Sequence, residues 1–176
     1  IKKEELKFED YIAKRNKFYP KIKIDQDILN DLEKKNLNIN IEPINLDDFR
    51  KVKKIGSGSF GNVYKIINKN IDNIYAAKIL NYEIDECSES IITDFSREVN
   101  NISILDHPAI LKFIGYSPFN FKKVNKPVII TEYAKNKSLD KIIELEYNGF
   151  GNSDWNDTKK LINIYGIASG MRYLHK

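Results

Sequence analysis

A glycine-rich segment at residues 56–63 constrains the fold of this chain more than any other feature. It contains Gly56, Gly58 and Gly61, and a lysine, Lys78, follows it in a short, mostly apolar stretch. Glycines allow backbone N–H groups to approach phosphate oxygens closely, and a lysine on a neighbouring strand adds a point charge. The segment therefore predicts a site that holds the phosphates of a nucleotide.

The sequence on both sides of the glycines predicts strands. Residues 49–55 lead into the segment, and residues 63–67 alternate in a way that is typical of a strand. A dinucleotide-binding loop would instead follow a strand and open a helix. We therefore expect the glycines in a hairpin between two antiparallel strands, followed by a polar turn at 68–73 and a third strand at 74–80.

An amphipathic helix and two more strands follow. Ser88 fits a helix N-cap, and the apolar positions that repeat every three or four residues after it are Ile92, Phe95, Val99, Ile102 and Leu105. The later segments predict strands at 111–116 and 127–133, a short helix at 138–144 and a long helix at about 157–175.

The bulk composition limits the class of protein. The chain has 176 residues, 41% hydrophobic and 31% charged, which predicts one domain, or one domain with an appendage. Its net charge is +4, and its lysines are spread along the chain, so we expect no nucleic-acid partner. No apolar run is long enough for a membrane segment. Cys87 is the only cysteine, which favours a reduced thiol in a cytoplasmic protein.

The first 46 residues differ in texture from the rest. They are dense in charge, and Ile28, Leu29 and Leu32 have the spacing of a short amphipathic helix. We predict a helical extension at 1–46. It is either a docking or regulatory arm or the tail of an upstream segment or linker.

Taken together, these motifs resemble the start of a eukaryotic-type protein kinase, from about Asp48 to the last residue. Residues 131–139 and 166–175 look most like the tyrosine-kinase-like group. The resemblance implies an α+β fold with a five-stranded antiparallel sheet, one regulatory helix, a hinge and the first helices of a truncated helical lobe. It places the ATP-binding N-lobe at 47–134 and the start of the C-lobe at 135–176.

The resemblance also implies a role for each matched residue. The backbone of residues 56–61 would cover the phosphates of ATP, and Phe60 at the tip would shield them from water. Val63 and Ala76 would pack on the two sides of adenine, although a plain strand valine and alanine are the alternative. The implied nucleotide-binding residues before the hinge are Ile55, Gly56, Ser57, Gly58, Ser59, Phe60, Gly61, Val63, Ala76 and Lys78.

Lys78 and Glu98 are the catalytic residues that the resemblance implies. Lys78 would contact the α- and β-phosphates, and Glu98 on the amphipathic helix would hold it in place. A long lysine side chain otherwise loses considerable rotamer entropy when it is ordered. The alternative for Glu98 is an exposed helix carboxylate.

The hinge supplies the remaining implied contacts. Thr131 matches the gatekeeper position behind the adenine, where a small side chain leaves a back pocket open. The Glu132 C=O and the Ala134 N–H would hydrogen-bond the adenine edge. Ser138 is a candidate ribose contact, with a helix cap as the alternative.

The resemblance implies a kinase that uses ATP and Mg²⁺ to phosphorylate protein Ser/Thr or Tyr hydroxyls. The family's catalytic aspartate and magnesium-binding residues have no counterparts in this sequence, so we expect the chain alone to be inactive. A pseudokinase or adaptor that binds nucleotide and protein partners without catalysis is the alternative, and an interaction module limited to the N-lobe is a third.

The last helix favours a fragment over such a module. Its apolar face would stabilise a fold by ~1.5–3 kcal/mol per buried side chain. Summed over the face, that approaches the stability of a whole domain. The side chains concerned are Leu161, Ile164, Ile167, Met171 and Leu174.

Overall fold

The computed structural model describes residues 39–84, 89–152 and 154–175. The described residues form two compact units. The first contains the residues up to Leu105 together with Phe113–Glu132, and the second contains Asp106–Lys112 and the residues from Tyr133 onward. The predicted helix near residues 25–35, the Ser88 cap and Cys87 lie outside the described residues.

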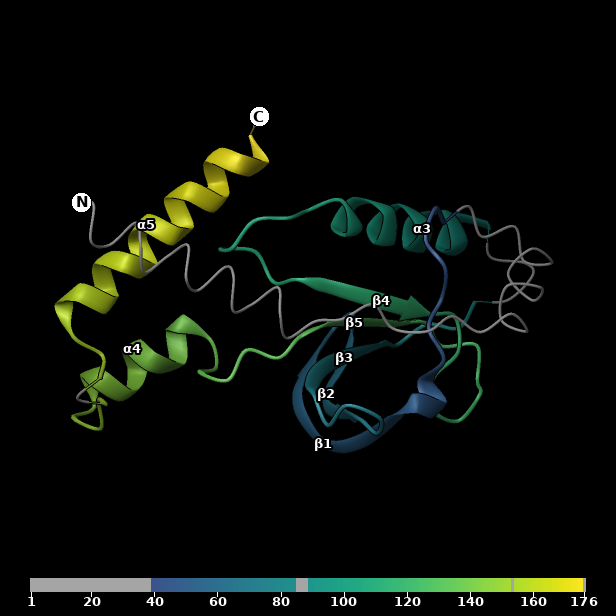
Figure 1. The fold of residues 1–176 in the computed structure, drawn as a ribbon, viewed down its shortest axis with the longest axis horizontal. Helices are drawn as coiled ribbons and strands as arrows, with labels where there is room; N and C mark the ends of the chain where they lie inside the picture. The colour runs from purple at the N-terminus through teal and green to yellow at the C-terminus, as the bar shows by residue number, and fades with distance from the viewer. Residues whose placement is uncertain (1–38, 85–88, 153, 176) are drawn as a thin grey trace. The chain divides into compact units, whose positions relative to one another are not determined.

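The first unit is built on a five-stranded antiparallel sheet in the order β1-β2-β3-β5-β4 (Figure 1). A 3-10 helix at Leu46–Asp48 precedes the sheet, and α3 follows β3. This confirms the predicted α+β fold with one helix after the third strand. The elements are β1 (Phe49–Gly58), β2 (Gly61–Asn68), β3 (Ile74–Leu80), α3 (Glu89–Ser103), β4 (Phe113–Ser117) and β5 (Val128–Glu132).

The glycine-rich segment forms the predicted hairpin, but most of it is paired strand. β1 continues to Gly58 and β2 begins at Gly61, and these two glycines face each other in the register. Only Ser59 and Phe60 lie in the turn. Gly61 also packs closely on β3, because a Cβ at this position would press against the Ile79 carbonyl oxygen and lie 3.2 Å from the Leu80 Cα. The close approach of the β2 and β3 backbones therefore requires a glycine here.

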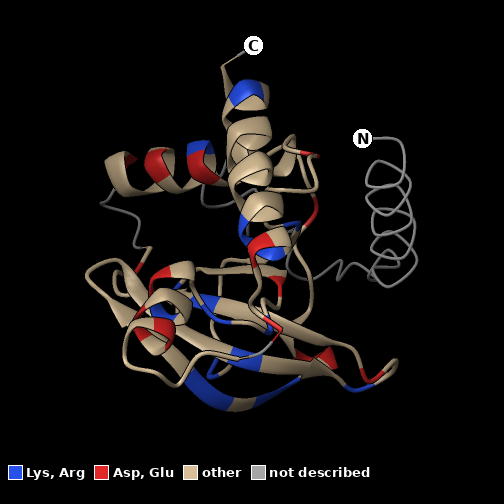
Figure 2. Cartoon of the chain, turned by 90° about the vertical axis from the view of Figure 1, so that its left-hand side faces the viewer, with Lys and Arg blue, Asp and Glu red and all other residues tan. Residues whose placement is uncertain are grey.

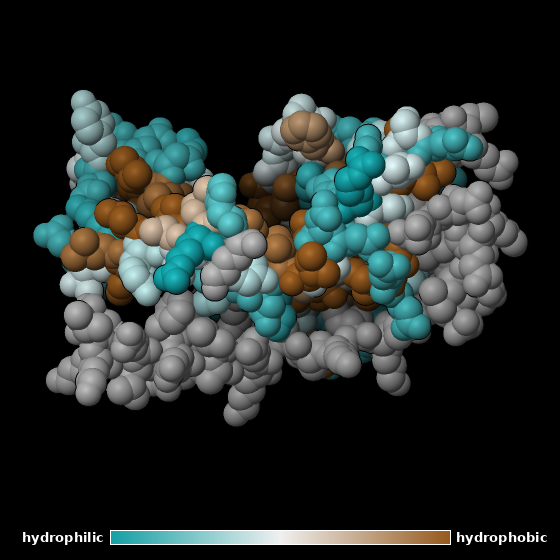
Figure 3. All heavy atoms as spheres, turned by 90° about the horizontal axis from the view of Figure 1, so that it is seen from above, coloured by the Kyte–Doolittle hydropathy of each residue, from teal (hydrophilic) through white to brown (hydrophobic). Residues whose placement is uncertain are grey.

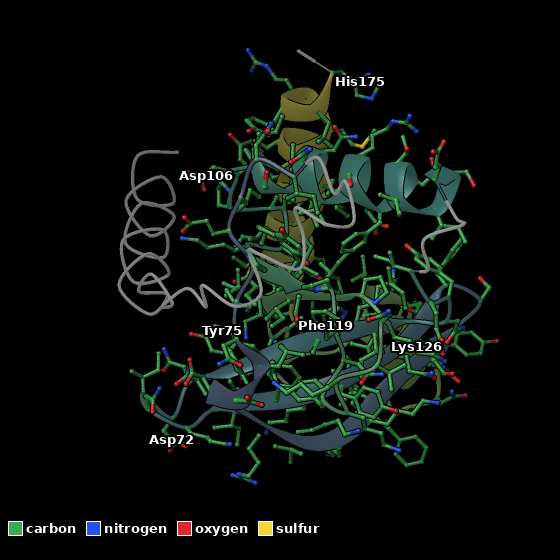
Figure 4. All side chains as sticks on the ribbon, turned by 90° about the vertical axis from the view of Figure 1, so that its right-hand side faces the viewer. Asp72, Tyr75, Asp106, Phe119, Lys126 and His175 are labelled. Carbon is green, nitrogen blue, oxygen red and sulfur yellow. The ribbon has the colours of Figure 1, made fainter. Side chains whose placement is uncertain are left out.

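Alternation along β3 divides the core of the first unit into two layers. Tyr75 and Ala77 are fully buried in one layer, together with Ile66 and Ile130 from the neighbouring strands (Figure 4 labels Tyr75). Leu80 and Ile129 lie in the other layer with Tyr116 and the apolar face of α3. Because side chains alternate along a strand, Ala76 and Lys78 share the α3 side of the sheet with Leu80.

The segment that precedes β1 is packed into the first unit. The Ile44 N–H donates to the Tyr116 carbonyl at 2.8 Å, and the Ile44 side chain is buried. Ile39 and Ile41 pack against the layer that holds α3. Between them, the Asn40 N–H donates to the Asn100 side chain on α3 at 3.0 Å. The chain before β1 thus makes hydrogen bonds to both β4 and α3.

The edge strand β1 is strongly basic. Its exposed side chains include Arg50, Lys51, Lys53 and Lys54, and Figure 2 shows this basic strand at the edge of the sheet. The Lys51 ammonium lies 4.5 Å from the centre of the Tyr64 ring. Lysines on an edge strand discourage pairing with another chain, so a solvated edge accounts for this charge.

The second unit contains two helices, α4 (Leu139–Tyr147) and α5 (Asp157–Leu174). Glu146 joins them, because it accepts hydrogen bonds from Trp155 Nε1 at 3.0 Å and from Lys160 Nζ at 2.6 Å. The apolar positions of α5 that were expected to need burial are exposed here, and Figure 3 shows hydrophobic atoms gathered on this unit. Leu161 is 67% exposed and Ile164 is 63% exposed.

The glycine hairpin gives a test of the packing between β2 and β3. We expect Gly61→Ala to reduce the free energy of unfolding by about 1–3 kcal/mol, because the new methyl group must push two paired backbones apart. Gly58→Ala is the matched control. Nothing lies within 4 Å of its added Cβ, so its effect should stay within about 0.5 kcal/mol. Urea denaturation followed by circular dichroism measures both, and equal effects would contradict the close approach.

Candidate functional site

Strand β3 brings together the residues predicted to hold a nucleotide. In the register, Val63 of β2 faces Lys78, and Thr131 of β5 faces Ala76. Facing residues of antiparallel strands project to the same side of the sheet, and Ala76 and Lys78 are two positions apart on one strand. All four side chains therefore share the α3 side of the sheet.

Helix α3 carries Glu98 to this side of the sheet. Ile92, Phe95 and Val99 are buried against the sheet, and the Phe95 ring meets the Tyr116 ring edge-on at 5.9 Å. Glu98 stands at the edge of this apolar face, and its Oε1 lies 3.5 Å from Lys78 Nζ. The predicted ion pair is thus present in the structure. The two side chains are 35% and 42% exposed, so the pair lies at the rim of the core.

Tyr82 lies close to this ion pair. It packs against the α3 layer of the core. Burial first, and then the negative charges of Glu98 and Asp94, raise the pKa of Tyr82 to about 12. The phenol is therefore harder to ionise than an ordinary tyrosine.

The turn of the glycine hairpin places an aromatic ring near the lysine. Phe60 is 74% exposed, and its ring centre lies 5.8 Å from Lys78 Nζ, within the range of a cation–π contact. Ser57 and Ser59 are also exposed. At the base of the hairpin, Ile55 is 41% exposed, and a Cβ on Gly56 would lie in ordinary contact with Val63 at 3.6 Å.

The end of β5 presents the predicted hinge residues of the first unit. The Thr131 hydroxyl donates to the Glu132 carbonyl at 3.2 Å. Thr131 and Glu132 are both half-buried.

Ala134 and Ser138 belong to the second unit. Both are exposed, and Ser138 occupies the N-cap position of α4. Its side chain makes no capping bond to the helix backbone. Instead, a hydrogen bond from Ser138 lowers the pKa of the Asp140 carboxyl. Ser138 therefore occupies the predicted cap position, but its hydroxyl bonds to the Asp140 side chain and not to the helix backbone.

A hollow is present in the second unit. It lies between α4 and α5, has a volume of about 230 Å³, and its lining includes Leu139, Trp155 and Ile167. Among the described residues, no group of three or more His, Cys, Asp or Glu side chains is placed to hold a metal ion.

Two residues that touch the site were missed by the sequence analysis. Tyr82 and Asn81 follow β3 directly, and Asn81 bonds to the glycine turn. A polar residue at the end of the strand that bears the lysine was the available signal. It carries little information without the structure, because strands commonly end in polar residues.

Comparison with known proteins gives a consistent family assignment. Residues 49–176 match the family model described as protein kinase domain. The chain is 31% identical over 133 residues to the Aurora kinase of Saccharomyces cerevisiae, which covers 76% of this chain and 33% of that protein. It is 30% identical over 128 residues to the probable serine/threonine-protein kinase PBL5 of Arabidopsis thaliana, covering 73% of this chain and 28% of that protein.

A third relative extends the comparison to receptor-like proteins. The cysteine-rich receptor-like protein kinase 2 of Arabidopsis thaliana is 33% identical over 128 residues, which are 73% of this chain and 18% of that protein. The chain thus spans about a third or less of the length of these relatives. Within the described residues, no helix is both long enough and apolar enough to cross a membrane.

The ion pair and the aromatic packing of α3 can be separated by mutation. We expect Glu98→Gln to change the free energy of unfolding by less than about 1 kcal/mol, because both partners are partly hydrated. Phe95→Ala on the same helix should cost about 3–5 kcal/mol, because it opens a cavity in the core. Urea denaturation tests both. A loss of more than about 2 kcal/mol in Glu98→Gln would show that the pair, and not apolar packing, holds α3 in place.

Proposed function

Because this chain belongs to the protein kinase family, we propose that it forms the ATP-binding part of a kinase that phosphorylates protein Ser/Thr or Tyr hydroxyls. In this proposal residues 47–134 are the nucleotide-binding lobe, 135–176 begin the second lobe, and 1–46 are an extension. The ion pair between Lys78 and Glu98 carries the proposal. It stands on the same side of the sheet as Val63 and Ala76.

The first unit would bind the phosphates and the adenine ring. The backbone of residues 56–61 would cover the phosphates, and Phe60 would limit the access of water to them. Lys78 would contact the α- and β-phosphates while Glu98 keeps its ammonium group in place. The apolar side chains of Val63 and Ala76 would pack on the faces of the adenine.

The segment after β5 would complete the nucleotide site. The Glu132 carbonyl would accept from the adenine edge, and the Ala134 N–H would donate to it. Thr131 would stand at the gatekeeper position, and Ser138 would be available to the ribose. The contacts of Glu132 and Ala134 use main-chain groups. They therefore depend on where these residues lie in the chain and not on their side chains.

Kinases use Mg²⁺ to neutralise charge on the transferred phosphoryl group, and an aspartate to accept the substrate hydroxyl proton. No residue of this chain is assigned to either role. We therefore propose the transfer step and the protein substrate for the whole protein. The same holds for its place in the tyrosine-kinase-like group. Cys87 is the only cysteine of the sequence. We therefore also propose that the protein works in a reducing compartment such as the cytoplasm.

A substitution of the lysine tests the proposal directly. In the full-length protein, Lys78→Met should abolish transfer of the γ-phosphate from radiolabelled ATP to a generic protein substrate, while circular dichroism shows unchanged folding. Methionine keeps most of the length and packing of the side chain and removes its charge. Lys54→Met, on the exposed edge strand β1, is the matched control and should keep full activity.

The outcomes distinguish an enzyme from an adaptor. Retained transfer in Lys78→Met would refute the role of the lysine. A wild-type protein that binds ATP but transfers no phosphate would favour the pseudokinase or adaptor. The same distinction can be read in the full-length sequence, where an HRDxxxxN motif followed by DFG supports the enzyme.

A further inference from the structure

Asn81 makes three hydrogen bonds to the turn of the glycine hairpin. Its side-chain Nδ2 donates to the Ser59 carbonyl at 2.9 Å and to the Gly58 carbonyl at 3.3 Å. Its backbone N–H donates to the Phe60 carbonyl at 3.3 Å. The residue that follows β3 thus binds three consecutive carbonyl groups, that of Gly58 at the end of β1 and those of Ser59 and Phe60 in the turn.

These bonds fix the orientation of the peptide groups in the turn. In a trans peptide the C=O and the N–H point in opposite directions, and no peptide bond among the described residues is cis. The Gly58 carbonyl shares its peptide plane with the Ser59 N–H, and the Ser59 carbonyl shares its plane with the Phe60 N–H. Because both carbonyls face Asn81, both N–H groups face away from it.

Two further side chains orient the amide of Asn81. Asn62 Nδ2 donates to Asn81 Oδ1 at 3.4 Å, and Ser57 Oγ donates to Asn62 Oδ1 at 3.0 Å. With its oxygen engaged by Asn62, the Asn81 amide presents its NH₂ group to the turn. The relay begins and ends on the glycine hairpin and passes through Asn81, which directly follows the strand that carries Lys78.

We infer that Asn81 is a positioning residue that holds the Ser59 and Phe60 N–H groups ready to donate to the phosphates of a bound nucleotide. The inference rests on the proposed function. A turn between two glycines has many accessible conformations, and the loss of this freedom opposes binding. Bonds that restrict the turn beforehand reduce that cost. Asn81 also ties the turn to the strand that bears Lys78, so both phosphate-binding groups share one support.

A purely structural role for Asn81 makes a different prediction. If Asn81 only completed the end of β3, its loss would weaken every ligand of the lobe alike. A role in orienting the turn should affect ligands that carry phosphates and spare those that lack them. Comparing AMP-PNP with adenosine therefore separates the two roles.

The experiment measures both ligands on the full-length protein by isothermal titration calorimetry with Mg²⁺ present. Asn81→Leu preserves the approximate shape of the side chain and removes its two Nδ2 donors. We expect the Kd for AMP-PNP to rise by roughly tenfold, as the loss of two neutral hydrogen bonds predicts, and the Kd for adenosine to change by less than about twofold. Asn81→Ala is the second variant and should show the same split. Asn62→Ala should show a smaller one.

Asn70→Leu is the matched control. Asn70 is also exposed, and its Nδ2 donates to the Asp48 side chain at 3.4 Å, but it lies in the turn at the other end of β2. It should leave both affinities unchanged. Urea denaturation of each variant establishes that the fold is retained.

Each outcome bears on a different part of the inference. Unchanged or tighter AMP-PNP binding in Asn81→Leu, with normal binding in the wild type, would overturn the positioning role alone. An equal loss for adenosine would also overturn it and leave a structural role. A wild-type protein that binds neither ligand would overturn the proposed function, and the inference with it.

Discussion

The register of β3 is the constraint on which the rest of the first unit depends. This strand pairs with β2 on one side and β5 on the other, so its alternation is imposed on both neighbours. Tyr75 and Ala77 enter one core layer, while Ala76 and Lys78 face the side that α3 covers. A slip of one residue would bury the lysine and expose the tyrosine. Burial of the apolar set therefore fixes where the charged group lies.

Stability and chemistry are carried by different groups in this unit. The fold is held by fully buried side chains such as Phe95, Tyr116 and Ile66, whereas Lys78 and Glu98 pair at the rim and keep contact with water. An exposed pair contributes little to stability, so its partners can exchange one ionic contact for another at low cost. Such a pair is suited to a site that must accept and release a charged ligand. Burial and the neighbouring carboxylates raise the pKa of Tyr82 beside this pair.

Local patterns predicted the elements of the fold, and tertiary contacts decided what the patterns left open. Alternation and helical spacing placed the five strands and α3, and the resemblance to protein kinases implied the ion pair between Lys78 and Glu98. The glycine run was expected in a hairpin, and most of it is paired, because β1 continues to Gly58 and β2 begins at Gly61. The contacts of Asn81 depend on how that hairpin lies against the end of β3, which the local sequence pattern does not encode. The same holds for Ile44, whose burial depends on a strand far along the chain.

The contact between Ile44 and Gly115 links two positions in evolutionary terms. A Cβ added at Gly115 would lie 3.0 Å from Ile44 Cγ2, which is tighter than side chains normally pack. A larger residue at 115 is therefore tolerated only in a background where residue 44 has become smaller or has moved. Residue 44 precedes the stretch that matches the family, which begins at residue 49. Part of the selection on β4 thus comes from sequence outside that stretch, and variation at these two positions should be correlated among close homologues.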